Sequence, residues 1–284
     1  MALIFAALFW TALWGPVGLM LATPLTVCLV VMGRHIPRLS FLGVLLSDEE
    51  ALTPAEDCYY RLLTVGDQDE SELAEAYLKA NSMTALYDAV FVPVITRMEM
   101  DYRMELLDEE QRMMVEQSLT DLIQDVGTRA QIARNAEKTT STQVAKNEKP
   151  LSVFCVPARA SRDELAATML AQLLRQENIE VETASAKLEA DELVKLVEPA
   201  GTDVICISVV SPSTVLHARY LCLKLRAKFR SERIVVGLWG FADGNTDAIR
   251  RVRESGADQV VTTFAEAVTE MQSAKQPHEE LAVM

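Results

Sequence analysis

The stretch "DVICISVVSPSTVLHARYLCLKLRAKFRSERIVVGLWG", residues 203–240, decides the fold of the second half of the chain. Two short runs rich in valine and isoleucine, 203–210 and 233–240, flank a longer segment, 214–229, whose apolar residues have helical spacing. A buried parallel strand reads as an unbroken apolar run, and a crossover helix is needed to bring the next parallel strand alongside it. This stretch therefore predicts a strand–helix–strand unit of a parallel sheet.

The same alternation continues on both sides of this unit. It predicts further strands at "LSVFCVPA", "IEVETAS" and "QVVTTF", and further helices over 162–176, 186–197, 246–254 and 264–273. Five strands alternating with five helices predict a doubly wound, flavodoxin-like parallel sheet with strand order 2-1-3-4-5 over residues 151–275. Ligands of such sheets bind beyond the carboxyl ends of the strands. The candidate ligand-binding residues there are Arg159, Ser208, Ser211, Ser213, His217, Gly237, Trp239 and Gly240.

In its alternation of strands and helices this domain resembles the cobalamin-binding domain. That family carries Asp-x-His-x-x-Gly after the first strand, and the resemblance implies a histidine as the lower cobalt ligand. The loop at this place, 158–163, contains no histidine, and the residues at 208–210 and 237–240 match the family's Ser-x-Leu and glycine pair only loosely. We therefore do not expect cobalt coordination through histidine, and we predict no cofactor.

Other chemistries common on this fold are excluded by the residues at the strand ends. A receiver domain needs acidic residues after strand 1, an aspartate after strand 3 and a lysine after strand 5, where this chain has Arg159, Ser208 and Thr262-Thr263. No Gly-x-Gly-x-x-Gly follows a strand, and no Gly-Lys-Ser/Thr loop occurs. With no nucleophile–base–acid triad in view, we do not expect an enzyme.

One anion-binding interpretation stays open. Ser211-Pro212-Ser213 opens the helix that contains His217 and Arg219, and helix N-termini favour anions such as a nucleotide or an acidic metabolite. Arg159 would converge on the same crevice. The alternative is a serine N-cap in front of a solvated helix face. The five cysteines, which form no Cys-x-x-Cys pair, predict no zinc site: Cys28, Cys58, Cys155, Cys206 and Cys222.

Residues 47–130 are predicted to be an acidic helical region. The formal net charge of the chain is −14, and residues 47–126 hold 20 acidic and five basic side chains. Such a balance argues against nucleic-acid binding, which needs a basic patch. Thr53-Pro54 predicts a helix start, Pro93 a kink or a boundary, and 107–110 a further start. Residues 131–150 are predicted to be a polar linker, and 276–284 a polar tail.

Two side-chain clusters in this acidic region have two interpretations each. The methionines are either an adaptable groove for a partner or ordinary core residues: Met98, Met100, Met104, Met113 and Met114. The carboxylates Glu99, Asp101 and Glu105 are either a metal site or a solvated helix face, and the absence of a neighbouring histidine favours the face. We therefore predict no metal.

The chain opens on an apolar stretch without a charged residue before Arg34. A helix needs about 20 apolar residues to cross about 30 Å of hydrocarbon. Gly15-Pro16 breaks the stretch, and only the second piece, 17–33, is long enough. The basic residues after it predict a cytoplasmic C-terminal side. Residues 1–46 are thus predicted to be a transmembrane segment; the alternatives are a signal peptide and a buried helix pair.

A specific pattern runs through this opening: Trp14-Gly15-Pro16, Gly18, Ala22-Thr23-Pro24-Leu25-Thr26, Gly33-Arg34-His35, Pro37 and Leu52-Thr53-Pro54. Over residues 1 to about 63 it resembles the last transmembrane segment and following linker of the autoinducer-2 exporter family, the PerM-like transporters. The resemblance implies the C-terminal fragment of an inner-membrane transporter with a cytoplasmic sensing or interaction domain. Its partners would be the lipid bilayer, missing upstream transmembrane helices or other subunits, and an anionic small molecule, with no nucleic acid.

A second function from a different class stays open. The chain would then be a membrane-tethered enzyme or small-ligand-binding protein that acts through the doubly wound domain. The sequence leaves the transported substrate undetermined, because a translocation path would lie mostly upstream of these residues.

Overall fold

The computed structural model describes residues 10–12, 15–17, 52–64, 68–140, 151–198, 201–241 and 246–275. The chain divides into two compact units, Met1–Thr53 and Pro54–Met284, and the second contains the predicted sheet. Except for its two short described pieces, the predicted transmembrane segment lies outside the described residues, as does the predicted tail. Within the ranges that the structure describes, no helix is both long enough and apolar enough to cross a membrane.

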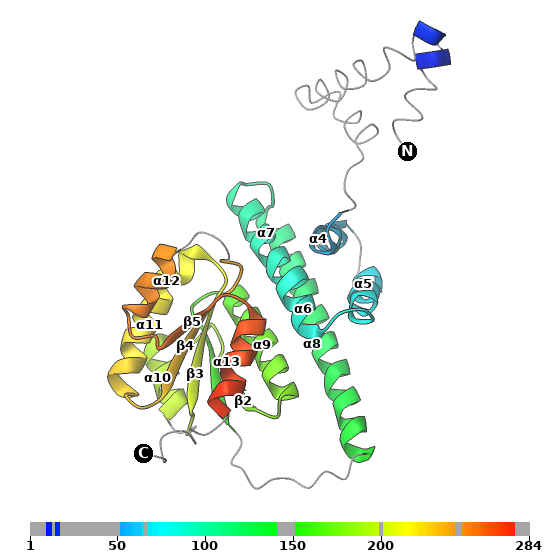
Figure 1. The fold of residues 1–284 in the computed structure, drawn as a ribbon. Coiled ribbons are helices and arrows are strands. Elements are labelled where there is room, and N and C mark those ends of the chain that lie inside the picture. The colour runs from blue at the N-terminus through cyan, green and yellow to red at the C-terminus, as the bar shows by residue number, and fades with distance from the viewer. Residues whose placement is uncertain are drawn as a thin grey trace. The chain divides into compact units, whose positions relative to one another are not determined.

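A parallel sheet of five strands forms the centre of the C-terminal half (Figure 1). The observed order, β2-β1-β3-β4-β5, confirms the predicted topology. Every residue of β3 is buried, because helices cover both faces of the sheet, and this explains its unbroken apolar sequence. The strands are β1 (Ser152–Pro157), β2 (Glu180–Thr183), β3 (Val204–Val209), β4 (Arg233–Leu238) and β5 (Gln259–Val261).

Two hydrophobic clusters, one on each face, hold the helices to the sheet. Successive side chains of a strand point to opposite faces, so Cys206 belongs to one cluster and its neighbour Ile205 to the other. The helices packed on the Cys206 face are α9 (Ser161–Gln176) and α13 (Phe264–Lys275). Those on the Ile205 face are α10 (Ala190–Val197), α11 (Val215–Lys228) and α12 (Thr246–Arg253). The doubly wound prediction is therefore confirmed.

A layer of helices packs against α9 and α13, on the Cys206 side of the sheet (Figure 1). Its apolar side chains belong to the same cluster as those of the sheet, with Tyr87, Phe91 and Ile123 among the most buried. We call α4–α8 the helical layer. Its elements are α4 (Pro54–Thr64), α5 (Gln68–Leu78), α6 (Met83–Leu86), the π-helix η2 (Tyr87–Phe91), α7 (Val92–Arg103) and α8 (Glu109–Thr140).

Pro93 does not end a helix, because α6, η2 and α7 follow one another without a break. Proline has no N–H to donate to the carbonyl four residues earlier. The chain accommodates this in a π-helical turn directly before it, where the N–H of Val92 bonds to the carbonyl of Tyr87. π-helical turns are rare and are often found at functional sites.

The predicted helix starts at Pro54 and near Asp108 are both observed, but the predicted linker begins too early. Helix α8 continues through 131–140, a stretch with good helix formers such as glutamine, alanine, arginine and lysine. Arg134 also fastens it to the end of α9 through hydrogen bonds to the Arg175 carbonyl and the Asn178 side chain. Residues 141–150 lie outside the described residues.

Candidate functional site

The carboxyl ends of β3 and β4 bring together three of the eight predicted residues. Ser208 and Gly237 are direct neighbours in the register of the two strands. Both lie on the sheet face toward α9 and α13, since Cys206 and Val235, two positions earlier on each strand, belong to the cluster on that face. Trp239 follows on the same face, and its indole lies against the backbone of Gly237 so closely that a Cβ on Gly237 would overlap the ring.

An aromatic cluster surrounds the indole. The ring of Trp239 stacks on that of Phe264, the first residue of α13, at 4.2 Å between centroids and 20° between planes. Phe264 in turn meets the edge of Tyr87, which stacks on Phe91. Two of these four rings come from η2 and two from the α/β part, so the cluster joins the helical layer to the sheet.

Two polar atoms in this cluster have no hydrogen-bond partner in the described part of the chain: Ser208 Oγ and Trp239 Nε1. Ser208 is 0% exposed and Trp239 is 1% exposed. A buried donor or acceptor without a partner costs about 1–3 kcal/mol. Most buried polar groups in native proteins are paired, so two exceptions this close together, one in β3 and one directly after β4, call for an explanation.

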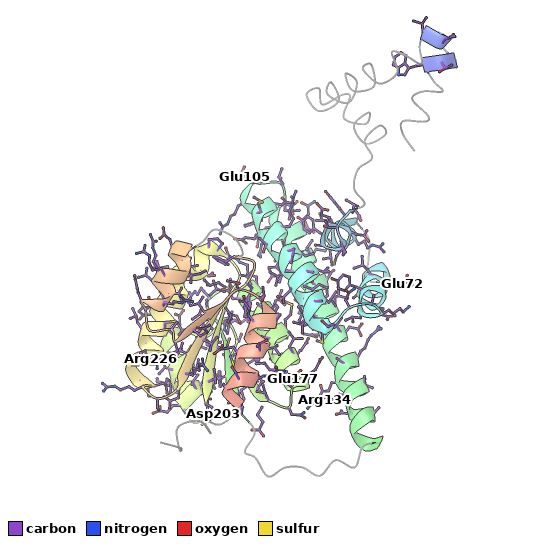
Figure 2. All side chains as sticks on the ribbon, viewed as in Figure 1. Glu72, Glu105, Arg134, Glu177, Asp203 and Arg226 are labelled. Carbon is purple, nitrogen blue, oxygen red and sulfur yellow. The ribbon has the colours of Figure 1, made fainter. Side chains whose placement is uncertain are left out.

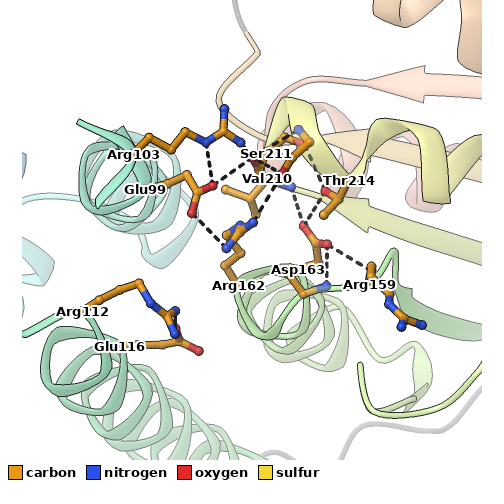
Figure 3. A network of polar contacts seen from close by, with 12 residues as sticks. Glu99, Arg103, Arg112, Glu116, Arg159, Arg162, Asp163, Val210, Ser211 and Thr214 are labelled. Atoms are coloured by element: carbon orange, nitrogen blue, oxygen red, sulfur yellow. Dashed lines mark hydrogen bonds and ion pairs between the residues drawn. The ribbon is translucent and has the colours of Figure 1, made fainter. Parts of the chain in front are cut away.

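Asp163 fixes the loop after β1 and was not among the residues predicted from the sequence. Its buried carboxylate accepts hydrogen bonds from the backbone N–H groups of Arg159, Ala160 and Val210, at 3.2, 3.0 and 2.9 Å. Burial raises the pKa of Asp163, and these N–H donors act against the rise. The carboxylate thereby ties the loop after β1 to the end of β3 (Figure 3).

Helix α7 closes the carboxyl edge of the sheet from the side of the helical layer. Glu99 forms an ion pair with Arg162 of α9 at 2.9 Å, and Arg103 donates to Ser211 Oγ at 2.8 Å (Figure 3). Gly240 approaches α7 so closely that a Cβ would lie 2.9 Å from Thr96 Oγ1. Gly240 also has φ of +75°, a conformation that favours glycine, so both its space and its backbone require this residue.

The predicted anion site is not assembled as expected. Arg159 turns to Glu189, with which it forms an exposed ion pair at 3.0 Å, and His217 lies on the exposed face of α11. Ser211 and Ser213 hydrogen-bond to each other at 2.9 Å. The carboxylate of Glu99, which lies 3.5 Å from Ser211 Oγ, already occupies the position in front of the serines. The chain thus provides its own anion there.

The alternative metal site also fails in the described residues. Asp101 accepts from the Tyr59 hydroxyl at 2.9 Å and from Arg97 at 3.0 Å, while Glu99 faces the α/β part. Glu105 lies beyond the end of α7 at the exposed tip of the hairpin with α8 (Figure 2). No group of three metal-ligating side chains occurs among the residues that the structure describes.

Comparison with solved structures finds a similar fold in a corrinoid protein. The monomethylamine corrinoid protein of Methanosarcina barkeri is similar with a TM-score of 0.57 at 11% identity, over 78% of this chain and 98% of that one. Since 151–275 is less than half of the chain, this similarity includes part of the helical layer. No protein-family model matches the sequence, and no curated protein matches it significantly.

Two further solved structures are similar at lower TM-scores. A cobalamin-binding protein from Desulfitobacterium hafniense DCB-2 covers 76% of this chain and 96% of its own, at 13% identity and a TM-score of 0.38. A methanol:cobalamin methyltransferase complex from Methanosarcina barkeri covers 83% and 92%, at 15% identity and 0.38.

These findings correct the interpretation of the chain as the end of a PerM-like transporter. That interpretation depended on residues 1 to about 63, most of which lie outside the described residues. The similarity that spans most of the chain is to a corrinoid protein instead. The expected inner-membrane location and the expected partners, a bilayer with missing upstream helices or other subunits, depended on the same interpretation and are corrected with it.

Proposed function

We propose that this chain is a small-ligand-binding protein whose site lies at the carboxyl ends of β3 and β4, beneath α7. The site consists of Ser208, Gly237, Trp239 and Phe264, and we call it the tryptophan site. The fold supports this position, because ligands of doubly wound sheets bind beyond the carboxyl ends of the strands. Three of its four residues are among those predicted from the sequence.

The observation that carries the proposal is the pair of buried polar atoms without partners, Ser208 Oγ and Trp239 Nε1. A ligand with hydrogen-bond acceptors would pair with both atoms and remove a cost of about 1–3 kcal/mol for each. The neighbouring rings of Phe264 and Tyr87 favour a flat aromatic group, which can stack at centroid distances of about 4.5–7 Å. The expected ligand therefore carries a planar ring with acceptor nitrogen or oxygen atoms.

The similar corrinoid protein makes a corrinoid the first ligand to consider, but the residues present do not fit one. The loop from Ala158 to Asp163 offers no imidazole to cobalt. The indole of Trp239 fills the space over Gly237, and α7 is held over the sheet edge by its contacts with Arg162 and Ser211. A smaller planar ligand would enter where the indole of Trp239 now lies, once the indole rotates and α7 moves away from the sheet edge.

We propose binding without catalysis. The cysteine thiols nearest the sheet would be poor nucleophiles, because burial raises the pKa of Cys155 and of Cys222 to about 12, and that of Cys206 well above its usual value. These thiols behave as small apolar side chains in the two clusters.

A single-tryptophan chain tests the proposal. With Trp10→Phe and Trp14→Phe, the fluorescence of the full chain reports Trp239 alone. We expect 5,6-dimethylbenzimidazole, a planar ring with acceptor nitrogen, to change this fluorescence saturably. Ser208→Ala should weaken the binding about fivefold to tenfold, the loss of one hydrogen bond, and should raise the stability of the free protein because an unpaired hydroxyl is removed.

Thr202→Val is the matched control. Thr202 Oγ1 is also buried without a partner in the described residues, but it lies at the opposite end of β3. The control should raise stability and leave the affinity unchanged. In a separate calorimetric titration with hydroxocobalamin, we expect no binding. An absent fluorescence response, or equal affinities in Ser208→Ala and the native sequence, would refute the tryptophan site.

A further inference from the structure

The hairpin between α7 and α8 ends in a set of exposed apolar side chains. We call this set the apolar tip: Met100, Tyr102, Met104, Leu106, Met113 and Met114. All lie within the last turn of α7, the connecting turn or the first two turns of α8. None of them belongs to the tryptophan site, so a role for the tip is a function separate from the ligand binding proposed there.

The methionines of this region divide into one core residue and four surface residues. Met98 is 1% exposed and packs in the cluster, whereas Met104 is 56% exposed. The core interpretation therefore holds for Met98 and fails for the four exposed methionines. Soluble proteins rarely gather apolar side chains on the surface unless the patch binds something. Methionine suits such a patch because its flexible side chain adapts to different partners.

The backbone of the turn presents Leu106 outward. Glu105 has φ of +58°, and the N–H of Leu106 bonds to the carbonyl of Asp101 at 2.9 Å, the pattern of a Schellman helix end. In such ends the apolar residue after the left-handed one usually packs against the last turn of its helix. Here Leu106 is 65% exposed instead. Its side chain is thus available to another molecule.

The charges around the tip are mainly negative. Glu105, Asp108 and Glu110 are exposed and form no ion pair in the described part of the chain. The two arginines nearest the tip are already paired with carboxylates: Arg103 with Glu99, and Arg112, which lies over the ring of Tyr102, with Glu109 and Glu116. A partner that covers the tip would therefore gain from positive charge.

We propose that the apolar tip is the docking surface for a basic amphipathic helix of a partner protein. The apolar face of that helix would cover the methionines and Leu106, and its lysines or arginines would face Glu105, Asp108 and Glu110. An amphipathic helix suits such a surface because its apolar anchors recur at helical spacing along one face. An anionic membrane is disfavoured as the occupant, since the same three carboxylates would be repelled by it.

The probe for this surface is a synthetic, fluorescently labelled peptide with leucines on one helical face and lysines elsewhere. Its binding to the full chain is measured by anisotropy at low and at physiological salt. We expect saturable binding that weakens with salt, because exposed charges are screened within about 8 Å at 0.15 M. The double variant Met104→Ser with Leu106→Ser should bind about tenfold more weakly, and Glu105→Lys with Glu110→Lys at least as weakly.

Matched variants elsewhere separate the tip from general attraction to an acidic protein. Leu216→Ser with Leu223→Ser removes two comparably exposed apolar side chains from α11, and Glu180→Lys with Glu182→Lys reverses two exposed charges on β2. Both should bind the peptide like the native chain. Circular dichroism of every variant reports whether the fold is retained.

Three results would overturn the proposal. The first is an equal loss of peptide binding in the matched variants. The second is concentration-dependent self-association of the native chain that Met104→Ser with Leu106→Ser abolishes, which would make a second copy the occupant. The third is binding to phosphatidylcholine vesicles, lost in the same double variant, without binding to the peptide.

Discussion

At the scale of single residues, the site depends on side chains whose partners lie far away in the sequence. Asp163 bonds to Val210, 47 positions later, and Glu99 lies against Ser211, 112 positions later. A carboxylate in the first turn of a helix is common, so nothing local distinguishes Asp163. Trp239 was predicted at the site, but the overlap of its indole with the space over Gly237 depends on packing that no sequence pattern displays.

The buried carboxylate of Asp163 predicts a pH dependence of stability. Burial raises its pKa in the folded protein above the ordinary carboxyl value. A group with a raised folded pKa contributes its stabilisation fully below the unfolded pKa and loses it as the pH rises through the folded pKa. In urea titrations, the stability advantage of the native chain over Asp163→Asn should therefore shrink as the pH rises from about 4 through this window.

Asp191→Asn is the control with the opposite sign. Lys224 lowers the pKa of Asp191, so its small contribution is present above the unfolded pKa and is lost as the pH falls. The advantage of the native chain over Asp191→Asn should grow with pH. If the stability advantage of the native chain over Asp163→Asn stays constant with pH, or grows, the pKa of Asp163 is not raised in the folded protein.

At the scale of elements, α7 decides whether a ligand can reach the tryptophan site. The helix is preceded by the π-helical turn η2 and is held over the sheet edge at Glu99 and Arg103. The sequence predicted an acidic helical region with a kink or a boundary at Pro93. It did not predict which surface α7 would cover, because an apolar stripe indicates that a face is buried without indicating against what.

Glu99→Gln should loosen this closure. The change keeps the shape of the side chain and removes the charge that pairs with Arg162, both partners being largely buried. If ligand entry requires α7 to move, weakening the closed form raises the population that can bind. We expect stopped-flow mixing with 5,6-dimethylbenzimidazole to show association several times faster than in the native chain, with Trp239 as the reporter.

Glu116→Gln provides the comparison on α8. Its ion pair with Arg112 is similarly shielded, at 2.7 Å, but both residues belong to α8 (Figure 3). That variant should associate with the ligand at the native rate. Equal rates in Glu99→Gln and Glu116→Gln would show that α7 does not limit entry.

At the scale of the whole second unit, the sequence predicted the sheet far better than the arrangement of layers. Each strand of the doubly wound part has its own apolar run, such as 204–209, and the observed order is one of the common orders of doubly wound sheets. The packing of the helical layer on α9 and α13 depends on separate contacts. Gln172 accepts from the Tyr87 hydroxyl and donates to the Ile123 carbonyl, and neither partner is near it in sequence.

Asp88 provides the sharpest test of whether these layers form one cooperative unit. Its carboxylate, in η2, accepts the backbone N–H groups of Phe264 and Ala265 at 2.7 and 3.1 Å, and so caps α13 from the helical layer. Asp88→Ala leaves both donors without this acceptor, at a cost of about 2 kcal/mol. Because the helical layer and the sheet share one hydrophobic cluster, the loss of free energy of unfolding should lower the stability of both.

Native-state hydrogen exchange measures directly whether the helical layer and the sheet open together. In Asp88→Ala, the slowest amides of β3 and of α8 should exchange faster by the same factor, since both report the opening of one cooperative unit. Asp57→Ala, which removes an intrahelical ion pair with Arg61 at the surface of α4, should change little. Faster exchange confined to α13, with α8 unchanged, would mean that the helical layer and the sheet open independently. Ligand access beneath α7 would then require only the helical layer to open, and the protection of β3 would stay at its native level.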